Sequence, residues 1–281
     1  TPGPDTALTD SSHTGASTNA PNILLIMADD LGKAQVGAYD PHGHAAKTPV
    51  IDDLAAKGLL FHRAYTASIC SPTRAQLMSG RYARRTGIGE VIFKGTGFQL
   101  QPGEFTLAEH LGHNGYETGI AGKWHLFGVA STTYPNALVT QGFDHSRVSR
   151  GNLVGGEDYF NWEKIVDGVV QTPWVTTYAT TETTDDAIAI TGQMEEPWLM
   201  YVPYHAPHDP WHVPPANLHT NPALTASSPA PDLADAMIEA MDTEIGRLLA
   251  TIDYADTLVI FLGDNGTMKG SERPPVDIDR V

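Results

Sequence analysis

Two pairs of oxygen-bearing side chains stand where apolar runs of the sequence end, and together they could bind a metal ion. Asp29 and Asp30 follow one run, and Asp264 and Asn265 follow another. Adjacent carboxylates after a buried strand require a cation or several hydrogen-bond donors. Oxygen ligands of this kind favour Ca²⁺ or Mg²⁺ over zinc. Each pair taken alone is more typical of a helix cap or a tight turn, so the metal-site hypothesis rests on the two pairs together.

Cys70 is the only cysteine in the 281 residues, so no internal disulfide can form. It stands just before an expected helix that carries Pro72 in its first turn and Arg74 close behind. At such a position, free backbone N–H groups and the helix macrodipole lower the pKa of a thiol and attract anions. These residues indicate a reactive cysteine or an oxyanion pocket, and a small buried apolar residue is the commoner alternative.

Lysine and histidine side chains follow two further apolar segments. Lys123 and His125 are two positions apart at the end of an expected strand, so both could face one side. A surface lysine and a capping histidine are the ordinary alternatives. His205 and His208 lie among prolines and could bind zinc or be structural. The sequence contains no HExxH spacing, Walker loop or GxSxG elbow, which argues against zinc proteases, nucleotide hydrolases and serine hydrolases.

Apolar patterning places these residues at the ends of predicted strands. We expect strands at 22–28, 59–66, 116–122, 198–202 and 258–262, and helices at 49–58, 72–80, 106–115 and after Pro231. The helix at 106–115 begins with a capping box formed by Thr106 and Glu109. The last helix has the clearest pattern, with apolar residues three and four positions apart: Leu233, Met237, Met241, Ile245, Leu248 and Ile252. Residues 129–171 are rich in Gly, Asn, Thr and Asp and predict long loops.

The alternation of strands and helices predicts an α/β sandwich with a mostly parallel central sheet. In such sheets, ligands bind outside the carboxyl ends of the strands. The polar clusters at 29–30, 123–125, 205–208 and 264–265 all fall at such ends. An apolar share of 41% indicates a globular core, and no apolar run is long enough for a membrane span. The formal charge of −16 argues against nucleic acid as a partner.

The stretch from Cys70 to Arg81, CSPTRAQLMSGR, resembles the type I sulfatase signature, C-x-P-S/T-R followed by a small-residue helix and Gly-Arg. Four further segments resemble blocks of the same family in the same order, at residues 21–32, 122–125, 205–208 and 263–266. Such an ordered set argues against a chance match. The resemblance implies an alkaline-phosphatase-like α/β/α sandwich and an arylsulfatase-like enzyme that hydrolyses sulfuric esters.

The resemblance also implies a role for each matched residue. Cys70 would be oxidised to formylglycine (3-oxoalanine) by a formylglycine-generating or anaerobic sulfatase-maturating enzyme, and its hydrate would attack sulfur. Arg74 would help to hold the hydrate, and His125 would assist collapse of the sulfated intermediate. Lys123 and His205 would bind sulfate oxygens and help the alcohol to leave. Calcium, with magnesium as the alternative, would be bound by the side chains of Asp29, Asp30, Asp264 and Asn265 and by the formylglycine at position 70.

The extent of the domain follows from the same resemblance. Residues 1–20, rich in Ser, Thr, Gly and Pro, are expected to form a flexible leader, which indicates a periplasmic or secreted protein. Residues 21–281 would be the amino-terminal portion of the catalytic domain. The sequence lacks the family's K-G-x-x-x-E-G-G-like segment, which Lys269 does not match, and the smaller carboxy-terminal subdomain.

The substrate stays open among aryl, alkyl and glycan sulfates. Tyr159, Trp162 and Trp174, in the expected loops at 129–178, could stack on a sugar or aryl ring or be ordinary core or surface aromatics. A phosphonate or phosphate monoester hydrolase of the same superfamily is the first alternative function. A non-catalytic module that binds sulfated glycans is the second, if Cys70 is unmodified.

Overall fold

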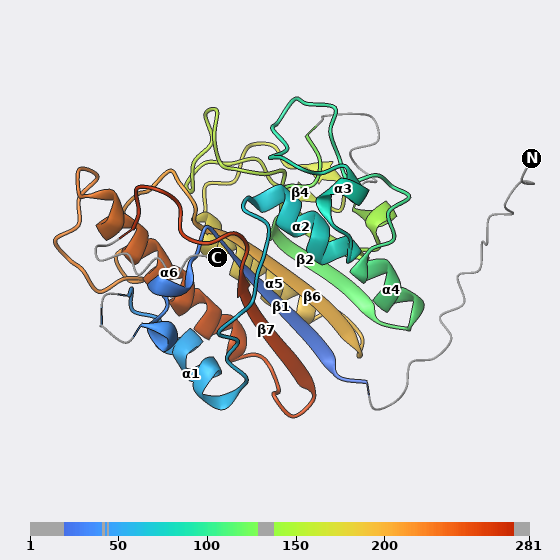
Figure 1. Ribbon diagram of the computed structural model, residues 1–281, viewed down its shortest axis with the longest axis horizontal. Helices are drawn as coiled ribbons and strands as arrows, with labels where there is room; N and C mark the ends of the chain where they lie inside the picture. The colour runs from blue at the N-terminus through green and yellow to red at the C-terminus, as the bar shows by residue number, and fades with distance from the viewer. Residues whose placement is uncertain (1–19, 41–42, 44, 129–137, 273–281) are drawn as a thin grey trace, which may run out of the picture.

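The computed structural model describes residues 20–40, 43, 45–128 and 138–272, which form a layered α/β structure (Figure 1). A seven-stranded sheet runs in the order β5-β4-β3-β2-β6-β1-β7. Its strands are β1 (Asn22–Asp29), β2 (Glu117–Lys123), β3 (His145–Ser149), β4 (Ile165–Val166), β5 (Val169–Val170), β6 (Trp198–Pro207) and β7 (Thr257–Gly263). Neighbours among β3, β2, β6, β1 and β7 pair in parallel, whereas β4 and β5 add antiparallel pairs at one edge. The predicted mostly parallel sheet is confirmed.

Strand β1 lies between β6 and β7 and contributes to the core on both faces of the sheet. Its side chains alternate, so that Leu24 and Ile26 pack into one apolar cluster and Leu25 and Met27 into the other. All of these side chains are buried. A strand that is covered on both faces needs a continuous apolar run rather than an alternating one, and this is why the sequence from Ile23 to Ala28 contains no polar residue.

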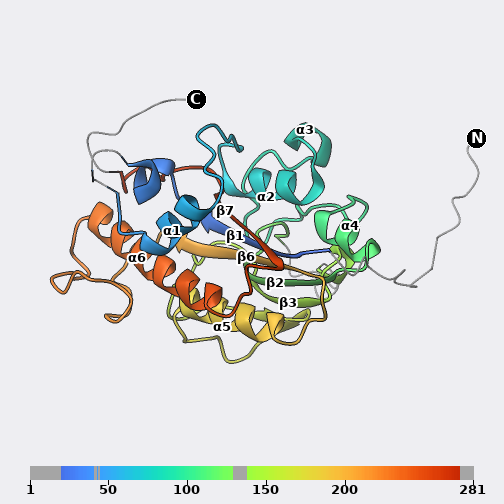
Figure 2. The ribbon, with the colours of Figure 1, turned by 90° about the horizontal axis from the view of Figure 1, so that it is seen from below.

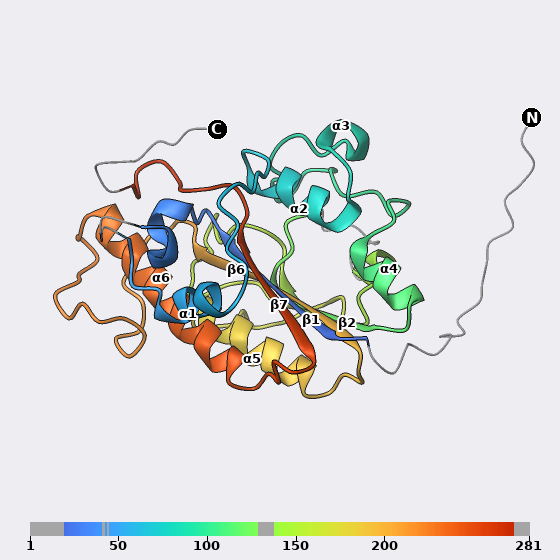
Figure 3. The same cartoon turned by 60° about the horizontal axis from the view of Figure 1, so that its bottom comes forward.

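Helices cover both faces of the sheet, as Figures 2 and 3 show. On one face lie α1 (Pro49–Lys57), α5 (Ala179–Thr191) and α6 (Ala230–Leu249), and on the other lie α2 (Cys70–Ser79), α3 (Ala83–Thr86) and α4 (Leu107–His113). Short 3₁₀ turns are η1 (Lys33–Gln35), η2 (Gly37–Tyr39) and η4 (Val139–Gln141). The predicted helices are confirmed, including the capping box at the start of α4, where Glu109 N–H donates to Thr106 Oγ1 over 3.1 Å. The apolar stripe of α6 is buried as expected from Leu233 to Leu248, whereas Ile252 lies beyond the end of the helix and is half-buried.

The predicted strand at 59–66 is wrong. This segment links α1 to α2 without strand structure, and Leu59, Phe61 and Tyr65 are 79%, 66% and 74% exposed. An apolar run forms a buried strand only where a neighbouring strand and a covering layer are available. The segment has neither, so its apolar residues lie at the surface.

The interpretation of residues 129–171 as long loops is also wrong in part. Residues 129–137 lie outside the described residues, but β3, β4 and β5 occupy parts of the remainder. Strand β3 is hard to recognise because its buried positions include Ser146 and Ser149. Its neighbour Arg147 pairs with Asp186 on α5 over 3.1 Å. These polar residues obscure the apolar pattern on which a strand prediction depends.

Helix α5 was not predicted at all. Its sequence contains many threonines, which are β-branched and therefore poor helix formers. Burial against β6 and α6 compensates, since Thr184 lies at 0% exposure with its hydroxyl 2.7 Å from that of Tyr204. The Thr184 hydroxyl also lies 3.2 Å from the carbonyl oxygen of Thr180 in the preceding turn. Tertiary packing thus overrides local propensity in α5.

The expected leader at 1–20 lies outside the described residues apart from Ala20. Among the described helices, none combines the length and apolar character needed to cross a bilayer. The parallel strands all end at the same side of the sheet, and α2 begins there as well (Figure 1). The sheet therefore gathers residues that are far apart in the sequence.

Candidate active site

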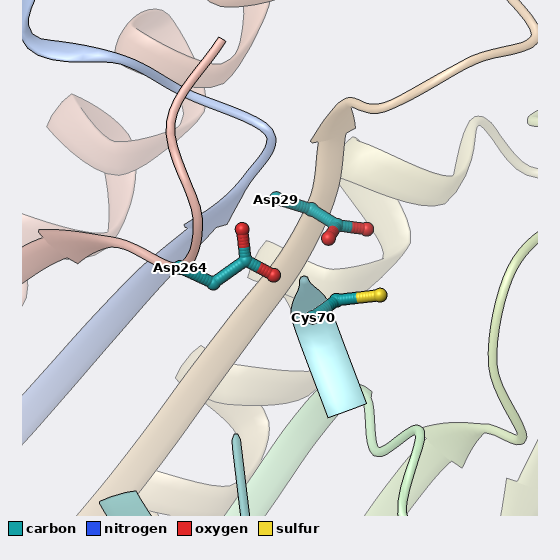
Figure 4. Close-up of side chains that lie close together, drawn as sticks. All are labelled: Asp29, Cys70 and Asp264. Carbon is teal, nitrogen blue, oxygen red and sulfur yellow. The ribbon is translucent and has the colours of Figure 1, made fainter. Parts of the chain in front are cut away.

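Four parallel strands and one helix start deliver the candidate residues to one edge of the sheet. Asp29 ends β1, Lys123 ends β2, Asp264 follows β7 directly, and His205 lies near the end of β6. Cys70 is the first residue of α2, and its side chain lies beside those of Asp29 and Asp264 (Figure 4). The predicted convergence of polar clusters at the carboxyl ends of the strands is thus observed.

Buried charges of opposite sign form the centre of this edge. The carboxylate of Asp29 accepts from the ammonium of Lys123, and its Oδ1 lies 3.3 Å from Nη2 of Arg74. The same Nη2 lies 3.1 Å from Oδ2 of Asp264. None of these four side chains is more than 1% exposed. Arg74 also donates from Nη1 to the carbonyl oxygen of Lys123 over 2.8 Å, which fixes α2 against β2.

The two carboxyls respond differently to this environment. Burial alone would raise the pKa of Asp29, but Lys123, His208 and Arg74 outweigh it and hold that pKa well below its ordinary value. Burial and the charge of Asp29 raise the pKa of Asp264 to about 8. Two buried carboxylates so close together cannot both ionise unless further positive charge is present. The charge of the cluster therefore favours the binding of a further cation.

Asp30 and Asn265 form a second pair beside the first. Asn265 donates from Nδ2 to Asp30 Oδ1, and Asp30 N–H donates to Asp264 Oδ1 over 3.0 Å. Asp30 adopts a left-handed backbone with φ of 64°, which is strained for a residue other than glycine. Burial and the neighbouring Asp29 charge raise the pKa of Asp30. Its Oδ2 lies 3.6 Å from His208 Nε2.

The donor set fits a hard divalent cation. Ligand atoms of Asp29, Cys70 and Asp264 lie within 4.8 Å of one another. Asp29 Oδ1 and Asn265 Oδ1 are buried, and within the described part of the chain neither accepts a hydrogen bond. Buried oxygens without donors are costly, and a cation bound between them would satisfy both. Oxygen donors of this type select Ca²⁺ or Mg²⁺. Asp30 lies outside the three-residue group and is engaged by Asn265 and His208.

The thiol of Cys70 does not have the lowered pKa that its position at a helix start suggested. Cys70 is buried, and burial raises the pKa of its thiol above the ordinary value. The charges of Asp29 and Asp264 act in the same direction. Lys123 and Arg74 oppose this shift without reversing it. An unmodified thiol here stays protonated at neutral pH and is a poor nucleophile. The lowered thiol pKa expected at a helix start is therefore not observed, and a catalytic role for Cys70 stays a prediction.

His125 is held in a tight backbone environment. Its φ of 59° is left-handed, and its carbonyl oxygen accepts from Ser71 Oγ on α2 over 3.0 Å. Its ring packs on Gly151, where a Cβ atom would lie only 2.8 Å from His125 Cδ2. Burial, Lys123 and Arg74 lower its pKa well below the ordinary value, so the ring is neutral at neutral pH. Its Nδ1 has no hydrogen-bond partner among the described residues.

His205 and His208 lie at the end of β6 and just beyond it, beside a small pocket. The pocket is lined by Asp29, Asn152, Leu153, Tyr159, His205, His208 and Asp209. Burial and Lys123 lower the pKa of His205. The pKa of His208 is raised despite burial, because of the Asp29 and Asp30 charges and a hydrogen bond that its ring donates to Asp209. His208 is therefore more readily protonated than a free imidazole, although the sequence analysis had considered it only as a possible zinc ligand or structural residue.

Residues at the end of β3 and just after it border the site and were missed from the sequence. Ser149, the last residue of β3, lies against His205, and Asn152 lines the pocket. Polar and glycine-rich segments of this kind carry no recognisable signal, because their function depends on where the fold places them.

Two of the three aromatic residues suggested for stacking are core residues: Tyr159 and Trp162 are each 1% exposed, whereas Trp174 is 37% exposed.

Replacing Arg74 by leucine should lower the free energy of unfolding by about 3–5 kcal/mol, because it leaves buried carboxylates without their counter-charge. Arg81→Leu is the matched control. Arg81 lies two residues after the end of α2 and pairs with Glu104, but its side chain is 48% exposed. The control should lose no more than about 1 kcal/mol. Urea denaturation in the presence of a chelator measures the free energy of unfolding of both variants. Equal losses for the two variants would contradict the buried cluster described above.

Comparison with known proteins identifies the family. The sequence model described as Sulfatase matches residues 21–275. The chain is similar to arylsulfatase A of Bos taurus, with 47% identity over 116 residues that cover 40% of this chain and 22% of that protein. It is also similar to steryl-sulfatase of Rattus norvegicus, with 42% identity over 113 residues that cover 38% of this chain and 19% of that protein. The matches span about a fifth of the length of these curated relatives.

Solved structures of other proteins share the fold of this chain. The crystal structure of Ps i-CgsB in complex with k-i-k-neocarrahexaose superposes with a TM-score of 0.74 at 28% identity, covering 91% of this chain and 61% of that one. PsFucS1 sulfatase from Pseudoalteromonas sp. shares the fold, with a TM-score of 0.69 at 22% identity over 87% of this chain and 55% of that one. The alkaline-phosphatase-like fold is thereby confirmed. With its family model matched over most of its length, this chain belongs to the sulfatase family.

Proposed function

We propose that this chain carries the catalytic site of a sulfuric ester hydrolase that cleaves a sulfate monoester by means of formylglycine made from Cys70, with a bound divalent cation. The observation that supports this most directly is the meeting of Cys70 with Asp29, Asp264, Arg74 and Lys123 at the buried edge of the sheet. Membership of the sulfatase family supports the same reaction class.

Arg74 and Lys123 suit the electrostatic demands of sulfuryl transfer. Negative charge accumulates on the sulfate oxygens and on the leaving oxygen as the ester bond breaks. Both cationic side chains are buried and held by Asp29 before any substrate binds, so little reorganisation is needed. Fixed charges in a water-poor site act more strongly than the same charges in water. We assign Lys123 to the sulfate oxygens and Arg74 to the side chain at position 70.

The chemistry of formylglycine explains why a cysteine should be converted. Once hydrated, it would offer two hydroxyl groups on one carbon, one to attack sulfur and one whose deprotonation would expel sulfate and restore the aldehyde. His125 is suited to accept that proton, because its ring is neutral and its Nδ1 has no partner among the described residues. His205 lies in the pocket wall and is assigned to the sulfate and leaving-group oxygens.

Asp29, Asp264 and Asn265 would hold the cation, together with the side-chain oxygen at position 70 after conversion. Asp30 would join them once its carboxylate turns from Asn265 and His208. Calcium is the first choice for these oxygen donors and magnesium the second. The cation would supply Lewis-acid stabilisation of the sulfate oxygens.

The proposal extends to partners and location. A formylglycine-generating or anaerobic sulfatase-maturating enzyme would convert Cys70, and export to the periplasm or outside the cell is the expected location. Substrates to test are aryl, alkyl and glycan sulfates. The glycan class is included because Ps i-CgsB, 28% identical to this chain, was crystallised with a neocarrahexaose.

Co-expression of the full chain with a formylglycine-generating enzyme should yield turnover of an aryl sulfate. Cys70→Ala should abolish it, and His125→Ala should lower kcat by about 10²–10⁴-fold, the usual contribution of a general base. His113→Ala, an exposed histidine on α4, is the control and should leave kcat unchanged. Faster turnover of an aryl phosphonate monoester would favour the phosphonate hydrolase. Binding of sulfated glycans without any turnover would favour the non-catalytic module.

Cation binding should strengthen as pH rises from 6 to 8. The pKa of Asp264 is raised to about 8 by burial and by Asp29, so below that pH the carboxyl is protonated and must lose its proton before it can bind the cation. The dissociation constant for Ca²⁺ should fall by up to about tenfold per pH unit, with proton release at pH 7. Calorimetry in two buffers of different ionisation enthalpy measures both effects. A pH-independent affinity without proton release would contradict this linkage.

A further inference from the structure

One tyrosine side chain ties together both ends of the turn that carries His205 and His208. The buried hydroxyl of Tyr159 donates to the carbonyl oxygens of His205 and His208, each over 2.8 Å, so its one proton is shared between them. Within the turn, His208 N–H donates to the His205 carbonyl oxygen over 2.9 Å. Both histidines line the pocket, and Tyr159 lines it beside them. The hydroxyl that holds this turn therefore also sets the shape of the pocket wall.

The turn needs this support because the pairing of β6 with β1 becomes irregular where the turn begins. Met27 pairs with Pro203, but the next paired residue of β1, Asp29, lies opposite Pro207. Four steps along β6 thus match two steps along β1, and a bulge of this kind interrupts the regular ladder of hydrogen bonds. Buried carbonyl oxygens in a bulge need donors from elsewhere in the fold. The tyrosine hydroxyl supplies that donor to His205, which lies in the middle of the bulge.

Tyr159 is itself fixed by its backbone and by its ring. Its carbonyl oxygen accepts from Ala179 N–H, at the start of α5, over 2.8 Å. Its ring packs against those of Tyr178 and His212, with centroid distances of 5.9 Å and 4.3 Å. Burial raises the pKa of the phenol well above its ordinary value, so the hydroxyl keeps its proton at neutral pH. The donor to the turn is therefore held in place before any substrate binds.

We propose that Tyr159 is a positioning residue for sulfate ester hydrolysis, which holds the end of β6 and its two histidines in the arrangement needed for turnover. It acts through the backbone of the turn. Because Asp29 pairs with Pro207 in this turn, the hydroxyl also fixes the histidines relative to a carboxylate of the proposed cation site. A displacement of reacting groups by about 1 Å can lower a rate by about 100-fold. The inference rests on the proposed function for the role of this turn.

Hydrogen exchange of the unconverted chain tests the hold on the turn without any need for turnover. Tyr159→Phe keeps the ring and removes the hydroxyl, so the His208 amide should exchange about five- to tenfold faster relative to the Met200 amide in the middle of β6. Tyr204→Phe is the matched control, because Tyr204 is buried in the same strand and its hydroxyl lies 2.7 Å from that of Thr184 on α5. The control should change the exchange of both amides by the same factor. An unchanged ratio in Tyr159→Phe would overturn the proposal.

Turnover of an aryl sulfate by the converted enzyme gives the second readout. Tyr159→Phe should lower kcat by about 10–100-fold and change KM by less than about twofold, since Lys123, assigned to the sulfate oxygens, is untouched. Tyr204→Phe should lose similar stability towards urea, because it also removes a buried hydroxyl, but should keep the wild-type kcat. Wild-type kcat in Tyr159→Phe, or an equal loss of kcat in both variants, would overturn the inference. Absence of sulfate ester turnover in the wild type would overturn the proposed function instead, and hydrogen exchange would still decide whether the hydroxyl holds the turn.

Discussion

The buried pairing of Asp29 with Lys123 and Arg74 is the interaction on which the rest of the site depends. Neither carboxylates nor cations are stable in a protein interior unless each has a partner. Arg74 reaches two carboxylates, Asp29 and Asp264, from the first turns of α2, so the helix that carries Cys70 is held against the ends of β1, β2 and β7. Substituting one member leaves the others with uncompensated charge.

The parallel sheet makes this pairing possible and also explains its strain. Strands that end at one edge bring together residues more than 200 positions apart in the sequence. The backbone N–H of Asp30, for example, donates a hydrogen bond to the side chain of Asp264. Left-handed backbone at Asp30 and His125 aims these residues into the site. Such conformations cost free energy and persist where the surrounding contacts over-determine them. Both residues are held in this way, Asp30 by Asp264 and Asn265, and His125 by Ser71 and the backbone of Arg150.

Much of the fold could be predicted because the apolar runs of β1, β6 and β7 and the stripe of α6 report burial directly. The approximate location of the site followed as well, since each polar cluster comes at the end of such a run. Strand β3 and helix α5 could not be predicted, because serines and threonines occupy several of their buried positions and obscure the apolar pattern. The contact of Ser149 with His205 joins residues 56 positions apart in the sequence. The raised pKa of the Cys70 thiol was not predicted either, because it results from burial, and the sequence does not show how deeply the thiol lies.

The central claim is that Cys70 serves as the precursor of the nucleophile and does not act as a thiolate. The mass of the tryptic peptide Ala64–Arg74, from protein co-expressed with a formylglycine-generating enzyme, tests it most directly. We expect a mass lower by about 18 Da than that of the cysteine form and capture of the peptide by a hydrazine probe. An intact thiol, under conditions that convert a control sulfatase, would rule out this role for Cys70.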